Sequence, residues 1–275
     1  MNNKSILITG CSSGIGYYCA KALQKRGYHV LATARQEDDV QRLLKEDLKA
    51  FKLDLSDSRS IQDAVEEVKK RTNGKLFALF NNGAYGQPGA VEDLTREVLK
   101  EQFETNLFGT HELTVKLLPL MRTQGYGRII QNSSVLGFIA LRFRGAYNAS
   151  KYALEGLSDT LRLELMGTNI HVSLLEPGPI RSDFRKNALE KFITNIDREN
   201  SPFKEEYVKK LQGLQSTEDV AFTLGEEAVF EALVHALESK KPKARYRITK
   251  PTTFFWFLKR IFSTKSLDKI LRKVE

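Results

Sequence analysis

The chain has 275 residues, 41% of them hydrophobic, which is enough for one large core, and a formal net charge of +9. That charge lies in residues 240–275, which hold 12 basic and 2 acidic residues, so the near-neutral body argues against a nucleic-acid-binding groove. Cys11 and Cys19 have no CxxC pattern and no nearby histidine, which argues against a disulfide framework or a metal site. With no secretory leader pattern and no apolar run of about 18 residues, we expect a cytoplasmic protein.

Strand and helix patterns alternate along the chain. Strands are predicted at 4–9, 28–32, 50–53, 76–80, 127–131, 170–175 and 245–248, and helices at 15–26, 36–47, 56–72, 96–122, 145–166 and 226–237. This order predicts an α/β fold in one domain over 1–250: a doubly wound Rossmann fold with a parallel seven-stranded sheet and helices on both faces. Ligands bind such sheets beyond the carboxyl ends of the strands, so the candidate site residues are those that follow each strand.

The loop after the first strand is rich in glycine and reads Thr9-Gly-Cys-Ser-Ser-Gly-Ile-Gly16. Glycines permit a tight turn, a close approach of backbone to a pyrophosphate, and close packing of the next helix, whose N-terminus attracts phosphate. The candidate cofactor-binding residues here are Gly10, Ser12, Ser13, Gly14, Ile15 and Gly16. The alternative is an ordinary turn with serine caps, which the strand–loop–helix context disfavours.

Arg35 follows the second strand, at the place where an NAD enzyme carries an acidic residue that holds the ribose hydroxyls. An arginine suits a 2′-phosphate instead, which predicts NADP(H) as the cofactor. The acidic residues 37–39 come later, where they favour a helix N-terminus. The alternative for Arg35 is a solvated loop charge.

Tyr147 and Lys151 are spaced i, i+4 in a helical segment, which puts a phenol and an ammonium on one face. We expect the ammonium to lower the pKa of the phenol from its usual value near 10, so that the tyrosine can protonate an alkoxide or take the proton in reverse. Ser134 follows a strand, where its hydroxyl can stabilise charge on a substrate oxygen. Asn106 lies mid-helix, where its amide is expected to bind a water that links to Lys151; the alternative is a helix kink or a surface position.

Together these motifs resemble the short-chain dehydrogenase/reductase family in its single-domain form, over roughly residues 4–250. The matching residues are the loop 9–16, Asp54-Leu55, Asn81-Asn82-Gly83-Ala84, Asn106, Ser134, Tyr147, Lys151 and Pro177-Gly178-Pro179-Ile180. Two positions depart from the family's usual wording: residues 83–84 read Gly-Ala instead of Ala-Gly, and Ser182 replaces a threonine but keeps the hydroxyl.

The resemblance implies a role for each of these positions. The implied cofactor contacts are Asp54 and Leu55 at the adenine, Asn82 and Gly83 beside the adenosine ribose, and Ile180 and Ser182 at the carboxamide; Pro177 and Gly178 are further implied cofactor-binding residues. The implied catalytic set is Tyr147 as acid and base, Lys151 also holding the nicotinamide ribose, Ser134 orienting the carbonyl, and Asn106 supporting a relay water. A homodimer or homotetramer through the long helices at 96–122 and 145–166 is implied as well.

The motif wording is similar to that of bacterial NADP-dependent aldehyde reductases and of retinol and 17β-hydroxysteroid dehydrogenases. This implies a lipophilic carbonyl or alcohol as substrate: an aldehyde, a retinoid or a ketosteroid. Residues 183–215 are predicted to form a substrate lid, although its aromatic residues have the alternative of only packing the lid down. A non-enzymatic NADP(H)-binding sensor and a nucleotide-sugar epimerase or dehydratase are the alternative functions; the complete catalytic set disfavours the first and the short chain the second.

Residues 251–275 are predicted to form a basic amphipathic helix, with Phe254, Leu258, Ile261 and Phe262 on one face. Such a helix fits a peripheral contact with the inner face of an anionic membrane, which would suit a lipophilic substrate. The alternative is a helix packed on the body or on a partner subunit.

Overall fold

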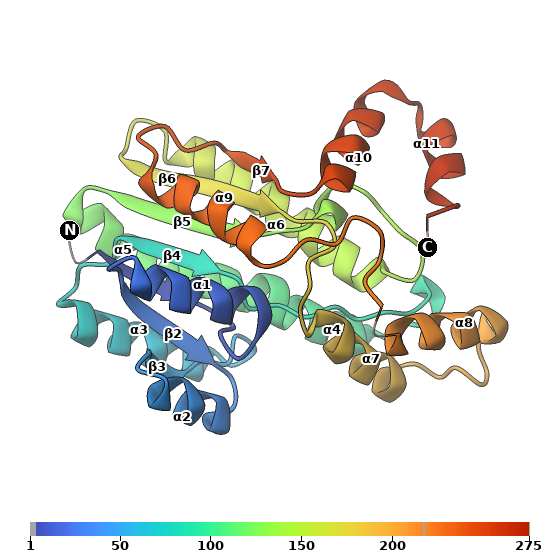
Figure 1. Cartoon of the computed structure of the whole chain (residues 1–275), viewed down its shortest axis with the longest axis horizontal. Helices are drawn as coiled ribbons and strands as arrows, with labels where there is room; N and C mark the ends of the chain where they lie inside the picture. Colours follow the sequence, from blue (N-terminus) through green and yellow to red (C-terminus); the bar gives the residue numbers. More distant parts are fainter. Residues whose placement is uncertain (1–3, 217, 275) are drawn as a thin grey trace.

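The structure, a computed structural model, describes residues 4–216 and 218–274. Within them, all strands pair in parallel in the order β3-β2-β1-β4-β5-β6-β7 (Figure 1). The strands are β1 (Ser5–Ile8), β2 (His29–Ala34), β3 (Lys49–Lys52), β4 (Ala78–Asn81), β5 (Gly127–Asn132), β6 (Ile170–Glu176) and β7 (Arg245–Arg247). The predicted doubly wound, seven-stranded sheet is confirmed.

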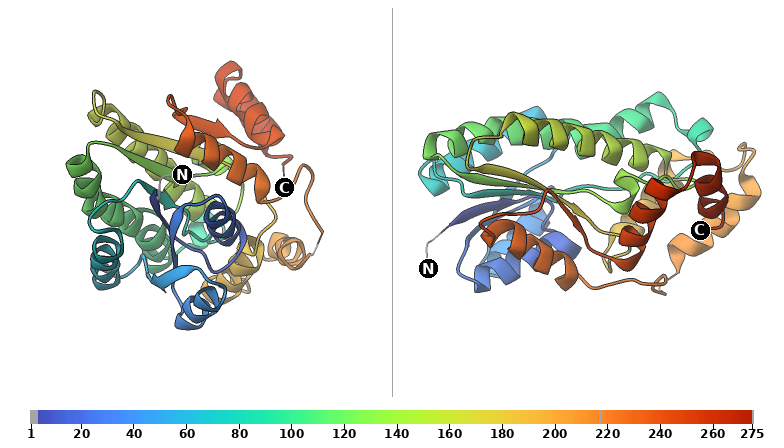
Figure 2. Two further views of the ribbon diagram at one scale, coloured as in Figure 1. Left: turned by 60° about the vertical axis from the view of Figure 1, so that its left-hand side comes forward. Right: turned by 90° about the horizontal axis from the view of Figure 1, so that it is seen from above.

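Helices cover both faces of the sheet (Figure 2). One face carries α1 (Gly14–Lys25), α2 (Glu37–Lys45) and α9 (Glu227–Glu238); the other carries α3 (Ser58–Thr72), α5 (Thr110–Gln124) and α6 (Gly145–Glu164). The strands are buried on both sides, as parallel sheets require: Ile6 and Ile8 belong to the core under α1 and α9, and Leu7 belongs to the core under α3 and α5.

The single helix predicted over 96–122 is interrupted. After α4 (Arg96–Phe103), a π-helical turn η2 (Glu104–Gly109) precedes α5. At its end the chain packs closely against the loop after β3, since a Cβ on Gly109 would lie only 1.7 Å from the carbonyl oxygen of Leu55. The predicted catalytic residue Asn106 lies in this turn, and π-turns are frequent at functional sites.

The lid region consists of α7 (Phe184–Asn195) and α8 (Lys204–Gln215). The single helix expected over 251–275 is instead two helices, α10 (Lys250–Ile261) and α11 (Thr264–Leu271), because the backbone is extended at Phe262 and Ser263; residue 275 lies outside the described residues. The four side chains expected on one apolar face are also divided, since Leu258 is buried and the other three are exposed. One face of this segment therefore packs on the body, as the alternative prediction expected, and the other face is exposed. In the described part of the chain, no helix is long and apolar enough to cross a membrane.

Candidate active site

The glycine-rich loop lies against the segments that follow β4 and β6. Gly10 and Gly14 have φ values of 68° and 52°, and their Cβ positions would fall 2.7 Å from the Cα of Gly83 and 2.9 Å from the Cβ of Ser182. At both positions, any other residue would strain the backbone and bring its Cβ too close to a neighbour. Ser13 is the N-cap of α1, yet its side chain makes no capping hydrogen bond, so the first N–H groups of the helix face the loop without a side-chain acceptor. This arrangement fits a dinucleotide pyrophosphate.

Asn82 ties three strand ends together. Its Nδ2 donates to the carbonyl oxygens of Thr9 (3.0 Å) and Gly10 (3.1 Å), and its Oδ1 accepts from Asn132 (2.9 Å). The hydroxyl oxygen of Thr9 in turn accepts the backbone N–H groups of Asn82 (2.9 Å) and Gly83 (2.7 Å). The side chain of Asn82 is therefore engaged within the protein, and its ribose contact stays a prediction. No role was predicted for Thr9, matched only as part of the loop 9–16, or for Asn132, because these hydrogen bonds join residues 50 to 74 positions apart in the chain.

Two residues predicted to contact the adenosine half of the cofactor follow β2 and β3. Arg35 directly follows β2, is exposed, and has no ion-pair partner within 4–216 or 218–274, as expected of a cation available to a phosphate. The Asp54 carboxylate accepts from the backbone N–H (2.9 Å) and the hydroxyl (2.7 Å) of Ser56, which fixes the turn after β3. Arg42, which the sequence analysis did not single out, reaches from α2 to the carbonyl oxygen of Ser12 in the glycine-rich loop.

On the nicotinamide side, the Pro-Gly segment after β6 is pressed against the N-terminus of α10. A Cβ on Gly178 would lie 2.2 Å from the hydroxyl oxygen of Thr249. Pro177 is buried, and Ile180 pairs through its backbone with Leu224. The structure therefore brings this predicted segment to the same sheet edge as the glycine-rich loop.

Tyr147 and Lys151 lie on α6 and are buried, with 8% and 3% of their surfaces exposed. Lys151 donates from Nζ to the carbonyl oxygen of Asn132 at 2.6 Å, and Nζ lies 5.6 Å from the centroid of the Tyr147 ring. Burial lowers the pKa of the Lys151 ammonium to about 8, and the charge of Glu155 opposes this effect. The predicted pair is thus assembled at the end of β5, with its ammonium fixed.

The expected effect of Lys151 on the phenol is wrong for this structure. Burial raises the pKa of Tyr147 to about 12, opposed by a hydrogen bond with Ser134 and by the charge of Arg144. The cation that favours the phenolate is therefore Arg144, three positions before the tyrosine, and burial outweighs it. At neutral pH the phenol is protonated, which suits a proton donor to a forming alkoxide.

Asn106 is buried, and its amide is engaged on both sides. Its Nδ2 donates to the carbonyl oxygen of Tyr85 (2.9 Å) and to the hydroxyl of Ser150 (3.2 Å), and its Oδ1 accepts the backbone N–H of Tyr85 (3.1 Å). The amide thus joins the π-turn, the segment after β4 and α6. Its support of a water linked to Lys151 stays a prediction.

The first residue of α7, in the predicted lid, packs on Tyr147. The Phe184 ring lies edge-on to Tyr147, with centroids 5.2 Å apart, and a Cβ on Gly86 would lie 2.6 Å from this ring. By contrast, Phe192 and Tyr207 are almost completely buried within the lid. The aromatic residues of the lid thus divide into two kinds: Phe184 faces the site, and the other two pack the lid down.

Behind Lys151 lies a cluster of charged side chains. Arg245 on β7 contacts the carboxylates of Glu155 (2.9 Å), Asp159 (2.7 Å) and Glu176 (3.0 Å). Glu176 is only 1% exposed, and burial raises its pKa to about 7, with the charge of Glu155 adding to the shift and Arg245 opposing it. Since the charge of Glu155 also acts on the pKa of Lys151, this cluster borders the predicted catalytic residues.

Known proteins similar to this chain belong to one family. Residues 4–192 match a family described as short chain dehydrogenase. The protein named uncharacterized oxidoreductase YbbO from Escherichia coli K12 is 42% identical over 269 residues, which cover 98% of this chain and 94% of that protein. Mouse 17-beta-hydroxysteroid dehydrogenase type 6 is 33% identical over 270 residues, covering 93% and 84%. A solved short-chain dehydrogenase from Streptomyces avermitilis superposes with a TM-score of 0.80 at 28% identity, covering 100% and 99%. From its sequence and from the site just described, the chain belongs to the short-chain dehydrogenase/reductase family of oxidoreductases.

Proposed function

We propose that this protein is an NADP(H)-dependent oxidoreductase that interconverts a lipophilic carbonyl compound and its alcohol. The observation that carries the proposal is the buried phenol of Tyr147, which lies beside Lys151 on α6 at the sheet edge where the glycine-rich loop lies, with Ser134 close enough to lower its pKa. The nicotinamide, when bound, supplies or accepts the hydride. Ser134 then holds the substrate oxygen, Tyr147 gives it a proton, and Lys151 stays positioned by Asn132.

The lipophilic nature of the substrate is supported by the lid. The Phe184 ring lies directly on Tyr147, so a substrate oxygen that reaches the phenol must pass an aromatic side chain. One relative is named for a steroid substrate. The test is consumption of NADPH, with NADH in parallel, against long-chain aldehydes, retinal and ketosteroids. Faster turnover of small polar carbonyls than of all these lipophilic ones would refute the substrate class.

The preference for NADP(H) rests on Arg35, since the fold itself accepts either dinucleotide. Replacing Arg35 with aspartate should lower kcat/KM for NADPH about 10–100-fold, the effect expected from losing one hydrogen bond to a charged group. The kcat/KM for NADH should stay equal or rise. Steady-state kinetics with both cofactors measure this. Arg59→Asp, an exposed position at the start of α3, is the control and should change neither value. Equal kcat/KM values for the two cofactors in the unmodified protein would contradict the preference.

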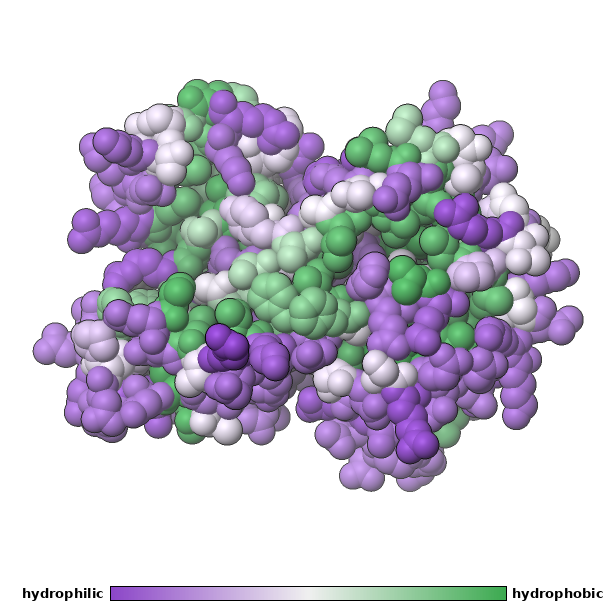
Figure 3. All heavy atoms as spheres, turned by 180° about the vertical axis from the view of Figure 1, so that it is seen from behind, coloured by the Kyte–Doolittle hydropathy of each residue, from purple (hydrophilic) through white to green (hydrophobic). Residues whose placement is uncertain are grey.

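We also propose that the protein forms a homodimer or homotetramer through α5 and α6 and resides in the cytoplasm. These helices leave several apolar side chains exposed, among them Val115 (41%), Leu157 (43%) and Leu163 (57%). Figure 3, which views this side of the molecule, shows apolar patches between polar side chains. Exposed patches of this kind mark subunit interfaces. The two cysteines are buried free thiols, which suits a reducing compartment.

A further inference from the structure

Helix α10 has two apolar faces. One face packs on the body: Leu258 is buried against Ile139, and the Lys259 ammonium donates to the carbonyl oxygen of Phe138 at 2.6 Å. The other face points outward, with Phe254, Phe257 and Ile261 each between 56% and 60% exposed. The spacing of these three residues, i, i+3 and i+7, puts them on one stripe of the helix. A fixed helix thus presents an apolar stripe to its surroundings.

The outward side of α10 and α11 is also strongly cationic. Six exposed basic residues lie here, against one acidic residue among the described positions: Lys250, Arg260, Lys265, Lys269, Arg272 and Lys273. In the part of the chain that the structure describes, none of the six forms an ion pair with a carboxylate. The cationic charge is therefore available to an external anionic partner.

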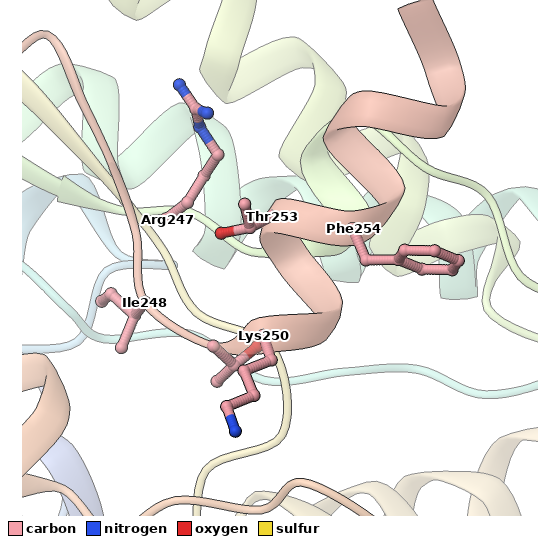
Figure 4. Close-up of a pocket in the computed structure, with 6 residues that line it drawn as sticks. Arg247, Ile248, Lys250, Thr253 and Phe254 are labelled. Carbon is pink, nitrogen blue, oxygen red and sulfur yellow. The ribbon is translucent and has the colours of Figure 1, made fainter. Parts of the chain in front are cut away.

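A hollow of about 440 Å³ lies at the start of α10 (Figure 4). It is lined by Arg247 and Lys250 beside the exposed ring of Phe254. Close by, the ring centroid of Trp256 lies 3.8 Å from the guanidinium carbon of Arg247 and 3.7 Å from that of Arg260. Cations next to exposed aromatic rings match a surface that offers phosphate groups above hydrocarbon chains.

We propose that the outward side of α10 and α11 docks on an anionic phospholipid surface. A second copy of the chain is a poor occupant, because six cations without carboxylate partners on each copy would repel one another. The docking would be peripheral, since apolar side chains of a single stripe reach only the headgroup and acyl boundary. The inference concerns this surface and does not depend on the proposed activity.

The position of the segment explains why docking would matter. Thr249, the N-cap of α10, lies against Gly178 in the segment after β6. Lys259 donates a hydrogen bond to the carbonyl oxygen of Phe138, four positions after Ser134. The segment is thus anchored to two loops that border the candidate active site. A lipid-bound α10 would hold that site near a bilayer, from which an apolar substrate can be drawn.

The test uses the full chain and its single tryptophan, Trp256, which lies in the proposed surface. Trp256 emission and co-sedimentation are measured with vesicles of phosphatidylcholine alone and with about 30% phosphatidylglycerol added, to supply the negative surface charge. We expect binding and a blue shift of the emission with the anionic vesicles only, reversed by high salt. Binding no tighter to anionic than to neutral vesicles would overturn the proposal.

Two variants locate the effect. Lys265, Lys269 and Lys273 are spaced by four, and changing all three to Gln should weaken binding to anionic vesicles roughly 100-fold, about fivefold per cation. Changing Phe254 and Phe257 to Ser should weaken it at least about tenfold. The matched control changes three exposed lysines elsewhere, Lys45, Lys70 and Lys75, to Gln and should bind as the parent does.

Thermal unfolding and nucleotide binding of each variant show whether it remains folded. An equal loss of vesicle binding in the control variant would assign the effect to net charge and overturn the proposal. So would a Phe254→Ser, Phe257→Ser variant that binds vesicles normally but changes oligomeric state, since that result would make the surface a subunit interface.

Discussion

Replacing Tyr147 with phenylalanine should lower kcat for carbonyl reduction by about 10²–10⁴-fold, the usual contribution of a positioned general acid. The Kd for NADPH should stay within about twofold, because the substitution removes only the hydroxyl. The ring remains to pack on Phe184, and the bond from Lys151 to Asn132 does not involve the phenol. Single-turnover kinetics measure the chemical step, and a fluorescence titration of NADPH measures its binding.

The matched control is Tyr152→Phe, on the same helix, which is 40% exposed and whose ring contacts Lys259 of α10. It should retain the kcat of the parent. If Tyr147→Phe turned over within a few-fold of the parent, the phenol would not be the proton donor. If the parent bound NADPH tightly and the whole carbonyl panel gave no turnover, a non-enzymatic sensor would become the better interpretation.

The fold was predictable because its signals are local. The run Ile6-Leu7-Ile8 is short and wholly apolar, as a strand buried on both faces must be. Asn73 and Gly74 both adopt positive φ and end α3 where the sequence predicted. Parallel strands end at one edge of the sheet, so the residues that follow β1, β4, β5 and β6 had to meet there. This is why most of the candidate site followed from motif order alone.

What the sequence did not show depends on contacts between distant segments. The π-turn at 104–109 arises where Gly109 meets Leu55, and nothing local in the helix pattern marks it. The pKa of Tyr147 depends on how deeply α6 is buried, which helical spacing does not reveal. Arg245 is 69 to 90 residues from its acidic partners, so its role could not be read from any motif.

The second large effect concerns stability. Arg245→Met should lower the free energy of unfolding by about 3–5 kcal/mol, the cost of removing one partner from a buried ionic cluster. Methionine preserves much of the apolar stem but leaves Glu176, 1% exposed, and Glu155 without their shared cation. Urea unfolding followed by circular dichroism measures the change.

The effect should depend on pH. In the folded protein the pKa of Glu176 is raised from about 4.5 to about 7, first by burial and then by the charge of Glu155. Because the folded pKa lies above the unfolded one, protonated Glu176 contributes stability that is complete below about pH 4.5 and is lost as the pH rises through about 7. Without Arg245 both carboxyl groups hold their protons more tightly. The deficit of the variant should therefore be smaller at pH 5 than at pH 8.

Arg26→Met is the matched control, because Arg26 also makes a two-pronged contact, with Glu238 at 2.6 and 2.7 Å, but at side chains that are 46% and 38% exposed. Its loss should lower the free energy of unfolding much less than the loss of Arg245, because solvent screens this exposed pair. Adding Glu155→Gln and Glu176→Gln to Arg245→Met should recover part of the deficit if unpaired charge is the cause. An Arg245→Met variant no less stable than Arg26→Met would show that the cluster is not stabilising. The charge of Glu155 also raises the pKa of Lys151. Comparing the same variants would therefore show whether the cluster acts on the Lys151 ammonium separately from its effect on stability.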